Sequence, residues 1–140
     1  MIPVRWIAVD WGSSNLRIWA MGEDDAALDH IASDQGMLGL SKAQYEQVLL
    51  RHIEPWLGDA VMPVVACGMV GSRQGWIEAP YETVPARPAS QTVSVKTKDP
   101  RIDVRVIAGV QQLEPADVMR GEETQISGYL SQNPSYSGVL

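Results

Sequence analysis

The residues best suited to chemistry form a short turn near the N-terminus. Asp10 follows an apolar run, residues 4–9, and Gly12, Ser13 and Ser14 come shortly after it. A ligand can approach the glycine backbone closely, and amides and serine hydroxyls can donate hydrogen bonds to phosphate oxygens. Asp10 would repel a bare phosphate, and Mg²⁺ suits the space between them because it prefers oxygen ligands and keeps several waters. The turn fits either such a site or an ordinary hairpin with an aspartate at its strand end.

A second polar group follows the apolar run at residues 61–67. The loop Gly68–Trp76 carries Arg73, whose guanidinium suits carboxylates, and Gln74, whose amide suits hydroxyl groups. Trp76 offers an apolar wall. Loops at the carboxyl ends of strands in open α/β sheets are where ligands bind. The alternative is a glycine-rich surface loop whose arginine is solvated.

Two adjacent carboxylates, Glu122 and Glu123, form a third candidate group. They lie within Asp117–Gln132, where a partial apolar face predicts a second helix. They either cap a helix N-terminus, which favours anions, or provide one carboxylate that accepts a proton from a sugar hydroxyl. The spacing does not choose between these interpretations.

These groups need a sheet to position them. Residues 4–9 and 15–21 are predicted to form the two strands of a hairpin, and residues 28–33 a third strand beside it. The nearly unbroken apolar runs 61–67 and 104–108 predict strands that are covered on both faces. Two of these strands end at candidate groups: residues 4–9 lead to Asp10, and residues 61–67 lead to the loop Gly68–Trp76.

One strong helix is predicted between these strands, over residues 42–57. Its apolar side chains recur at the helical period: Tyr45, Val48, Leu49, His52, Ile53 and Trp56. Ser41 fits the N-cap position, and Gln44 is placed to complete a capping box. A strand reached through a helical crossover is expected to be parallel to its neighbour. Residues 80–90 are predicted to be irregular, and the alternating residues 92–97 fit an exposed strand.

Composition narrows the class of protein. The 140 residues carry a net charge of −6 and show no basic cluster, which argues against nucleic acid or an anionic membrane as partner. No apolar run is long enough to cross a membrane, and no signal peptide is recognisable, so we expect a cytoplasmic protein. Cys67 is the single cysteine, which excludes an intrachain disulfide, and we interpret it as structural.

Three segments resemble known motifs. The pattern D-x-G-[ST]-[ST]-x-x-[KR] resembles the phosphate-1 element of the sugar kinase, hsp70 and actin superfamily. Its matching residues here are Asp10, Gly12, Ser13, Ser14 and Arg17. Gly68–Trp76 and Met119–Gln125 resemble the 2-dehydro-3-deoxygalactonokinase family specifically. The resemblance extends over nearly the whole chain, which is similar to the N-terminal half of such a kinase.

The resemblance implies an α/β fold. The implied domain is the ribonuclease-H-like (actin-type ATPase) domain, with a mixed five-stranded sheet of order 3-2-1-4-5 flanked by helices. Residues 1–132 would form the N-terminal actin-like ATPase half-domain, and residues 133–140 would begin a truncated second half-domain. Half of a two-lobed protein is expected to expose an apolar face, so we expect self-association into homo-oligomers.

The implied activity is that of a carbohydrate kinase. ATP, with Mg²⁺, would phosphorylate 2-dehydro-3-deoxy-D-galactonate at its 6-hydroxyl, and the chain would be the N-terminal half of the enzyme. The fragment alone is expected to be inactive, since the second phosphate motif and the adenosine-binding half are missing. The alternative is a non-catalytic nucleotide-binding or regulatory half-domain of the same superfamily.

The resemblance also implies a role for each residue. Asp10 would hold Mg²⁺, Gly12, Ser13 and Ser14 would contact the β- and γ-phosphates, and Arg17 would help to neutralise them. Glu122 is the first choice for the general base, with Glu123 as the second. The substrate-binding candidates are Trp11, Asn15, Arg73, Gln74 and Trp76. The carboxylate of the sugar acid gives Arg73 a chemical reason to be there.

Overall fold

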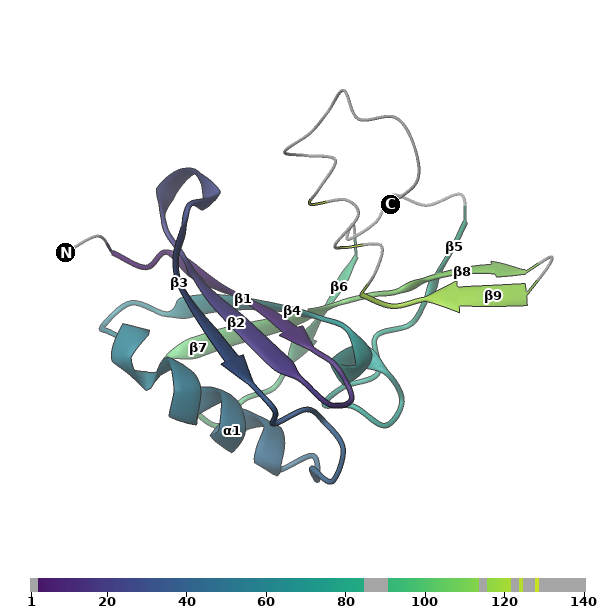
Figure 1. Cartoon of the computed structure of the whole chain (residues 1–140), viewed down its shortest axis with the longest axis horizontal. Helices are drawn as coiled ribbons and strands as arrows, with labels where there is room; N and C mark the ends of the chain where they lie inside the picture. Colours follow the sequence, from purple (N-terminus) through teal and green to yellow (C-terminus); the bar gives the residue numbers. More distant parts are fainter. Residues whose placement is uncertain (1–2, 85–90, 114–115, 122–123, 125–127, 129–140) are drawn as a thin grey trace.

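A computed structural model describes residues 3–84, 91–113, 116–121, 124 and 128 of the chain. Its main element is a six-stranded sheet of order β3-β2-β1-β4-β7-β6 (Figure 1). The strands are β1 (Trp6–Trp11), β2 (Leu16–Met21), β3 (Ala27–Ser33), β4 (Met62–Cys67), β6 (Thr92–Val95) and β7 (Ile102–Ile107). Short 3-10 turns occur at Glu23–Asp25, Glu54–Trp56 and Met69–Gly71.

The sheet is mixed. Strands β1, β4 and β7 are parallel neighbours, whereas β2, β3 and β6 pair antiparallel with theirs. The hairpin register places Asp10 opposite Arg17, and the parallel register places Asp10 beside Cys67. The carboxyl ends of β1 and β4 therefore reach the same edge of the sheet, as a helical crossover between parallel strands requires.

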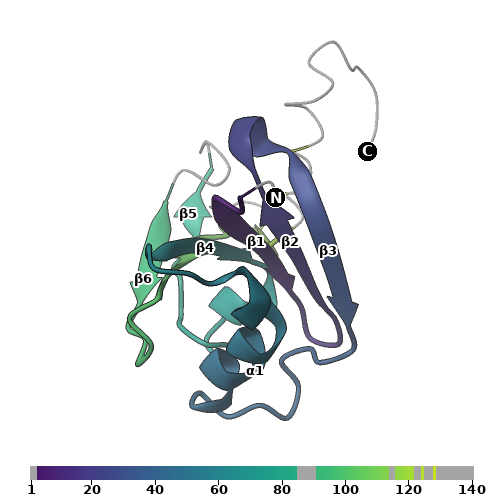
Figure 2. The same ribbon diagram turned by 90° about the vertical axis from the view of Figure 1, so that its left-hand side faces the viewer.

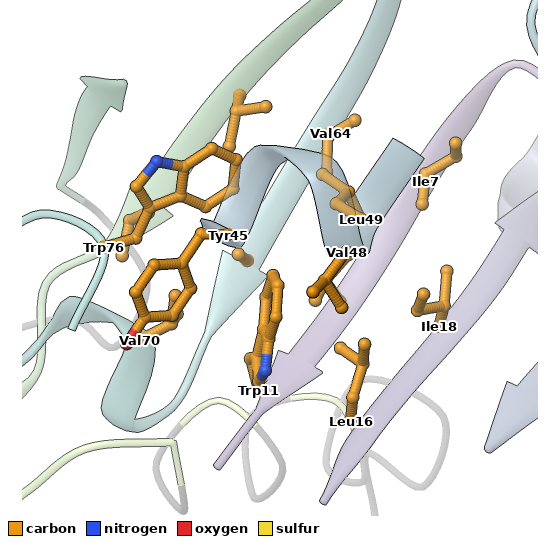
Figure 3. Close-up of a cluster of buried hydrophobic side chains, with 14 of the residues drawn as sticks. Ile7, Trp11, Leu16, Ile18, Tyr45, Val48, Leu49, Val64, Val70 and Trp76 are labelled. Atoms are coloured by element: carbon orange, nitrogen blue, oxygen red, sulfur yellow. The ribbon is translucent and has the colours of Figure 1, made fainter. Parts of the chain in front are cut away.

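Helix α1 (Gln44–Ile53) covers one face of this sheet (Figure 2). Alternate residues of β1, namely Ile7, Val9 and Trp11, are buried toward it because successive side chains of a strand point to opposite faces. Figure 3 shows Val48 and Leu49 of the helix packed against these strands. The core thus lies between α1 and the odd-numbered side chains of β1.

A smaller sheet extends from the first. It has the order β5-β8-β9, with β5 (Glu82–Thr83), β8 (Val110–Leu113) and β9 (Ala116–Met119). The sequence predicts an irregular segment at residues 80–90, where the structure has the two-residue strand β5, and a helix from Asp117. The predicted start of this helix is wrong, because residues 116–119 pair with β8 and are held in an extended strand. Thr124 and Gly128 are helical, and the rest of the predicted helix lies outside the described residues.

The predicted sheet was correct in order and wrong in size. The first four strands and the strand at 102–107 take the predicted order, but β6 adds a sixth strand at the edge, where it pairs with β7. Helix α1 begins later than predicted, with Ala43 rather than Ser41 as its N-cap. Half of the predicted capping box is present, since Gln44 Oε1 accepts a hydrogen bond from the Ser41 amide at 2.7 Å.

None of the helices in the described parts of the chain is long and apolar enough to span a membrane.

Candidate active site

Asp10 lies at the carboxyl end of β1, at the centre of the sheet. It is half-buried, with Arg17 of β2 on one side and Cys67 of β4 on the other. A hollow of about 370 Å³ opens beside it, lined by Asp10, Gly12, Ser13, Ser14, Asn15 and Arg17. The five residues of the predicted phosphate motif therefore meet in one concave site, together with Asn15.

The turn that forms this hollow is closed by its own backbone. The Gly12 amide donates to Asn15 O at 2.9 Å. Within the described residues, no hydrogen bond uses the amides of Ser13 and Ser14. Two adjacent amide donors and two hydroxyl groups thus remain available to an anion, which is the usual chemistry of a phosphate-binding turn.

A second segment supports the turn from behind. The amides of Met37 and Leu38 donate to Gly12 O at 2.9 Å and to Ser13 O at 3.1 Å. Gly36 lies so close that a Cβ there would be 2.3 Å from Ser13 O. Because the two carbonyl groups are held in this way, the turn has a fixed orientation. In the sequence, the glycine at position 36 is the one signal of this contact.

Gly68 and Gly121, which begin two other candidate segments, lie close to Asp10 and to each other. Neither Arg73 nor Gln74 lines the hollow beside Asp10. A Cβ on Gly68 would lie 3.1 Å from Asp10 Oδ1, and a Cβ on Gly121 would lie 3.2 Å from Gly68 Cα. Both glycines have positive φ, 98° and 103°. The loop that starts at Gly68 and the segment that starts at Gly121 therefore both begin beside the Asp10 carboxylate.

The two candidate bases, Glu122 and Glu123, lie outside the described residues. Their neighbours on both sides are described: Gly121 contacts Gly68, and Thr124 lines a cavity of about 220 Å³ that Asp10 also lines. The rest of that cavity is mainly apolar, with walls from Trp6, Ala8, Val9, Trp19, Val65, Cys67 and Ile107. Gly121 and Thr124, the described neighbours, therefore both lie in the region of Asp10.

Arg73 and Gln74 are exposed in the loop after β4. Helix α1 holds the backbone of this loop: Lys42 Nζ donates to Gly75 O at 3.3 Å, and the Tyr45 hydroxyl donates to Gln74 O at 3.4 Å. Burial raises the pKa of the Tyr45 phenol, which keeps it a neutral donor. The loop is therefore anchored by its backbone, and its two polar side chains remain at the surface.

The two tryptophans among the substrate candidates lie in the core instead. Trp11 has no exposed surface, its Nε1 donates to Gln35 O at 3.0 Å, and its ring meets Tyr45 edge-on at 5.2 Å. Trp76 is 8% exposed and stacks on Tyr45 at 5.9 Å. Figure 3 shows the three rings close together within the hydrophobic cluster. These rings therefore offer a sugar little or no surface, and they pack in the core next to the site.

The donor set suits a magnesium ion that keeps most of its water. The described residues contain no group of three or more His, Cys, Asp or Glu side chains arranged to hold a metal. Mg²⁺ in phosphoryl-transfer sites is commonly held by one or two carboxylates and by the substrate phosphates. Asp10, beside a hollow that offers amides and hydroxyls, fits that requirement.

One family of known proteins is similar to this chain over most of its length. The family model described as 2-keto-3-deoxy-galactonokinase matches residues 10–140. The chain therefore belongs to the 2-keto-3-deoxy-galactonokinase family.

Individual relatives agree with this assignment. A curated protein of Escherichia coli (strain K12), "2-dehydro-3-deoxygalactonokinase", is 37% identical over 99% of this chain and 47% of its own length. "Probable 2-dehydro-3-deoxygalactonokinase DgoK1" of Rhizobium meliloti (strain 1021) is 40% identical over 88% of this chain and 41% of its own length. The chain spans less than half the length of either relative.

A solved structure has the same fold. The crystal structure described as that of "a putative 2-dehydro-3-deoxygalactonokinase protein from Sinorhizobium meliloti" is similar with a TM-score of 0.78 and 37% sequence identity. The match covers 91% of this chain and 42% of that one. The similarity thus extends over almost all of the present chain and under half of the solved one.

Proposed function

We propose that this chain is the phosphate-binding half of a kinase that transfers a phosphoryl group from ATP to the 6-hydroxyl of 2-dehydro-3-deoxy-D-galactonate. The observation that carries the proposal is the hollow at the end of β1, where Asp10 adjoins a turn with unused amides. Membership of the family supports the choice of substrate. The order β3-β2-β1-β4-β7 within the large sheet supports a ribonuclease-H-like half-domain.

Phosphoryl transfer depends mainly on alignment and on neutralisation of charge. In the proposed site the amides and hydroxyls of Ser13 and Ser14 orient the phosphate oxygens of ATP, and Gly12 lets them approach the backbone. Arg17, which projects from β2 opposite Asp10, neutralises part of their charge. When bound, Mg²⁺ supplies the remaining positive charge, and Asp10 is the residue that would hold it.

The sugar acid is proposed to lie on the side of the Gly68–Trp76 loop. Arg73 would bind its carboxylate, and Gln74 and Asn15 would bind its hydroxyl groups. All three side chains are exposed in the described structure. Trp11 and Trp76 hold this region in place from the core and are not proposed as contacts. Glu122 is proposed to accept the proton of the 6-hydroxyl, with Glu123 as the alternative base.

The remaining length of the relatives completes the proposal. It would supply the second phosphate motif and the adenosine site, so we expect residues 1–140 alone to have no kinase activity. Residues 133–140, the proposed start of the second half-domain, lie outside the described residues. A cytoplasmic location and self-association of the isolated half stay predictions.

The test is release of ADP, measured in a coupled assay on a protein that carries this chain within the full length of its relatives. We expect turnover with 2-dehydro-3-deoxy-D-galactonate and none with an analogue that lacks the 6-hydroxyl. Absence of turnover in the full-length protein would remove the substrate assignment. Turnover by residues 1–140 alone would contradict the division of the site between two halves.

The matched pair E122Q and E123Q then tests the base. Loss of a general base lowers kcat by about 10²–10⁴-fold. We expect that loss in E122Q, with ATP binding retained, and a small effect in E123Q. Unchanged turnover in both variants would assign the glutamates to a helix cap. ATP binding without turnover in the unaltered protein would favour the non-catalytic half-domain.

A further inference from the structure

Arg120 is the one charged residue that is buried in the described part of the chain, with 8% of its surface exposed. Burying a charge is costly unless close partners compensate for it. It stands directly before Gly121, the residue that contacts Gly68 beside Asp10. The contacts around Arg120 must therefore compensate for burial of its charge.

The guanidinium is held by the segment that follows the Gly68–Trp76 loop. Its Nη2 donates to Ala79 O at 2.6 Å, and its Cζ lies 4.3 Å from the centre of the Tyr81 ring. A cation over an aromatic face is attracted to it, most strongly when water is excluded. The amide of Ala79 in turn donates to Gly71 O at 2.8 Å. Arg120 is thereby linked to the 3-10 turn that opens the loop.

The slot around the guanidinium has no spare room. A Cβ on Gly71 would lie 2.6 Å from Arg120 Nη1, and a Cβ on Gly109 would lie 2.8 Å from the Tyr81 ring. Two glycines are therefore required for the arginine and its aromatic partner to fit. Planar stacking and directed hydrogen bonds are properties of arginine that lysine does not reproduce.

We propose that Arg120 is a positioning residue, which fixes Gly121 against Gly68 and so holds these two segments together beside Asp10. The catalytic meaning of this rests on the proposed function. Arg120 acts through the backbone and is not placed in contact with either substrate. A displacement of about 1 Å in a catalytic group can cost about 10²-fold in rate.

The test compares R120K with R105K in the full-length protein. Arg105 lies on β7 with 54% of its side chain exposed, so its replacement controls for the change of residue type. We expect R120K to lower kcat at least tenfold and to leave the KM for ATP within twofold. The reason is that the Gly12–Ser14 turn is supported independently by residues 36–38. R105K should match the unaltered protein.

Hydrogen exchange supplies a readout that does not depend on activity. In R120K we expect severalfold faster exchange in a peptide spanning residues 119–124, and unchanged exchange in the hairpin of β1 and β2. Y81L, which removes the aromatic face and keeps the arginine, should change exchange and kcat in the same direction by less. It provides the test if R120K does not fold.

The outcomes separate the two proposals. Unchanged kcat and unchanged exchange in R120K would overturn the positioning role. A rise in exchange throughout the sheet, with kcat and KM both impaired, would also overturn it, because that pattern describes general destabilisation. If the unaltered protein lacks kinase activity, the proposed function fails, and local exchange in R120K still decides whether Arg120 holds the segment.

Discussion

Gly68 lies directly against the carboxylate of Asp10. A Cβ on Gly68 would be 3.1 Å from Asp10 Oδ1 and 2.8 Å from Trp11 O, and the residue has φ 98° and ψ −161°. This backbone conformation is essentially confined to glycine. The position is thus restricted twice, by conformation and by space, at the point where the parallel strands β1 and β4 end.

Replacing Gly68 should therefore damage both stability and the site. We expect G68A to lower the free energy of unfolding by about 1–3 kcal/mol, the usual cost of such a strained residue. It should also weaken binding of magnesium-ATP. Urea denaturation and calorimetric titration measure the two effects. G58A is the matched control, since a Cβ at Gly58 has no atom within 4 Å. Equal stability of the two variants would contradict the close contact.

Gly36 provides a test of the phosphate turn. A Cβ there would lie 2.3 Å from Ser13 O and 2.4 Å from Ser14 C, so G36A must displace the turn. We expect ATP binding to weaken at least about tenfold, or about 1.4 kcal/mol. L38A is the control in the same segment, since its side chain is 71% exposed and its amide is kept. ATP binding of unaltered strength in G36A would show that the turn does not hold the phosphates.

The buried position of Trp11 predicts a structural phenotype. W11F removes the hydrogen bond to Gln35 O and part of the packing against Tyr45. The Gln35 carbonyl is partly buried, and an acceptor buried without its donor costs about 1–3 kcal/mol. We therefore expect a loss of stability of up to that size. The KM for the sugar acid should stay within about twofold. A large rise in that KM, with stability unchanged, would instead make Trp11 a substrate contact.

The sequence predicted the part of the fold that local patterns determine. Apolar and polar residues alternate in β2, which is typical of a strand with one buried face. The apolar runs of β1 and β4 are typical of strands covered on both faces. These strands and the hairpin turn could therefore be recognised. The five motif residues from Asp10 to Arg17 lie within that hairpin, which is why the sequence brought them together correctly.

The rest depends on contacts between distant segments. Residues 116–119 are extended because they pair with β8, and a partial helical pattern at Asp117 does not reveal that partner. A tryptophan suits both a ligand site and a hydrophobic core, so residue type alone does not place Trp11 and Trp76. The packing of α1 against them is what makes them core residues. The support of Ser13 by Leu38 is a backbone contact, for which side-chain identity gives almost no signal.

The ion pairs of Arg101 should make the stability of the protein depend on pH. It donates to Glu54 Oε1 at 2.7 Å and to Asp99 Oδ2 at 2.8 Å, and these hydrogen bonds lower the pKa of both carboxyl groups. Carboxyls with lowered pKa contribute stability above their usual pKa, about 4, and lose it as the pH falls through the lowered values. R101Q should therefore be less stable than the unaltered protein at neutral pH, and this difference should shrink in acid.

Urea denaturation across that pH range provides the measurement. R105Q is the control, because the contact of Arg105 with Asp103 is longer, at 3.6 Å. A difference between R101Q and the unaltered protein that stays constant into acid would show that the two carboxylates do not stabilise the fold through Arg101.

The most direct test of the phosphate site is D10N, measured by ADP release at increasing magnesium concentration in the full-length protein. D29N, at an exposed position on β3, is the control. Loss of a metal contact worth several kcal/mol should lower kcat at least about 100-fold and remove the magnesium dependence that the unaltered protein and D29N retain. Turnover by D10N at the unaltered rate, with the same response to magnesium, would contradict a metal-phosphate site at the end of β1.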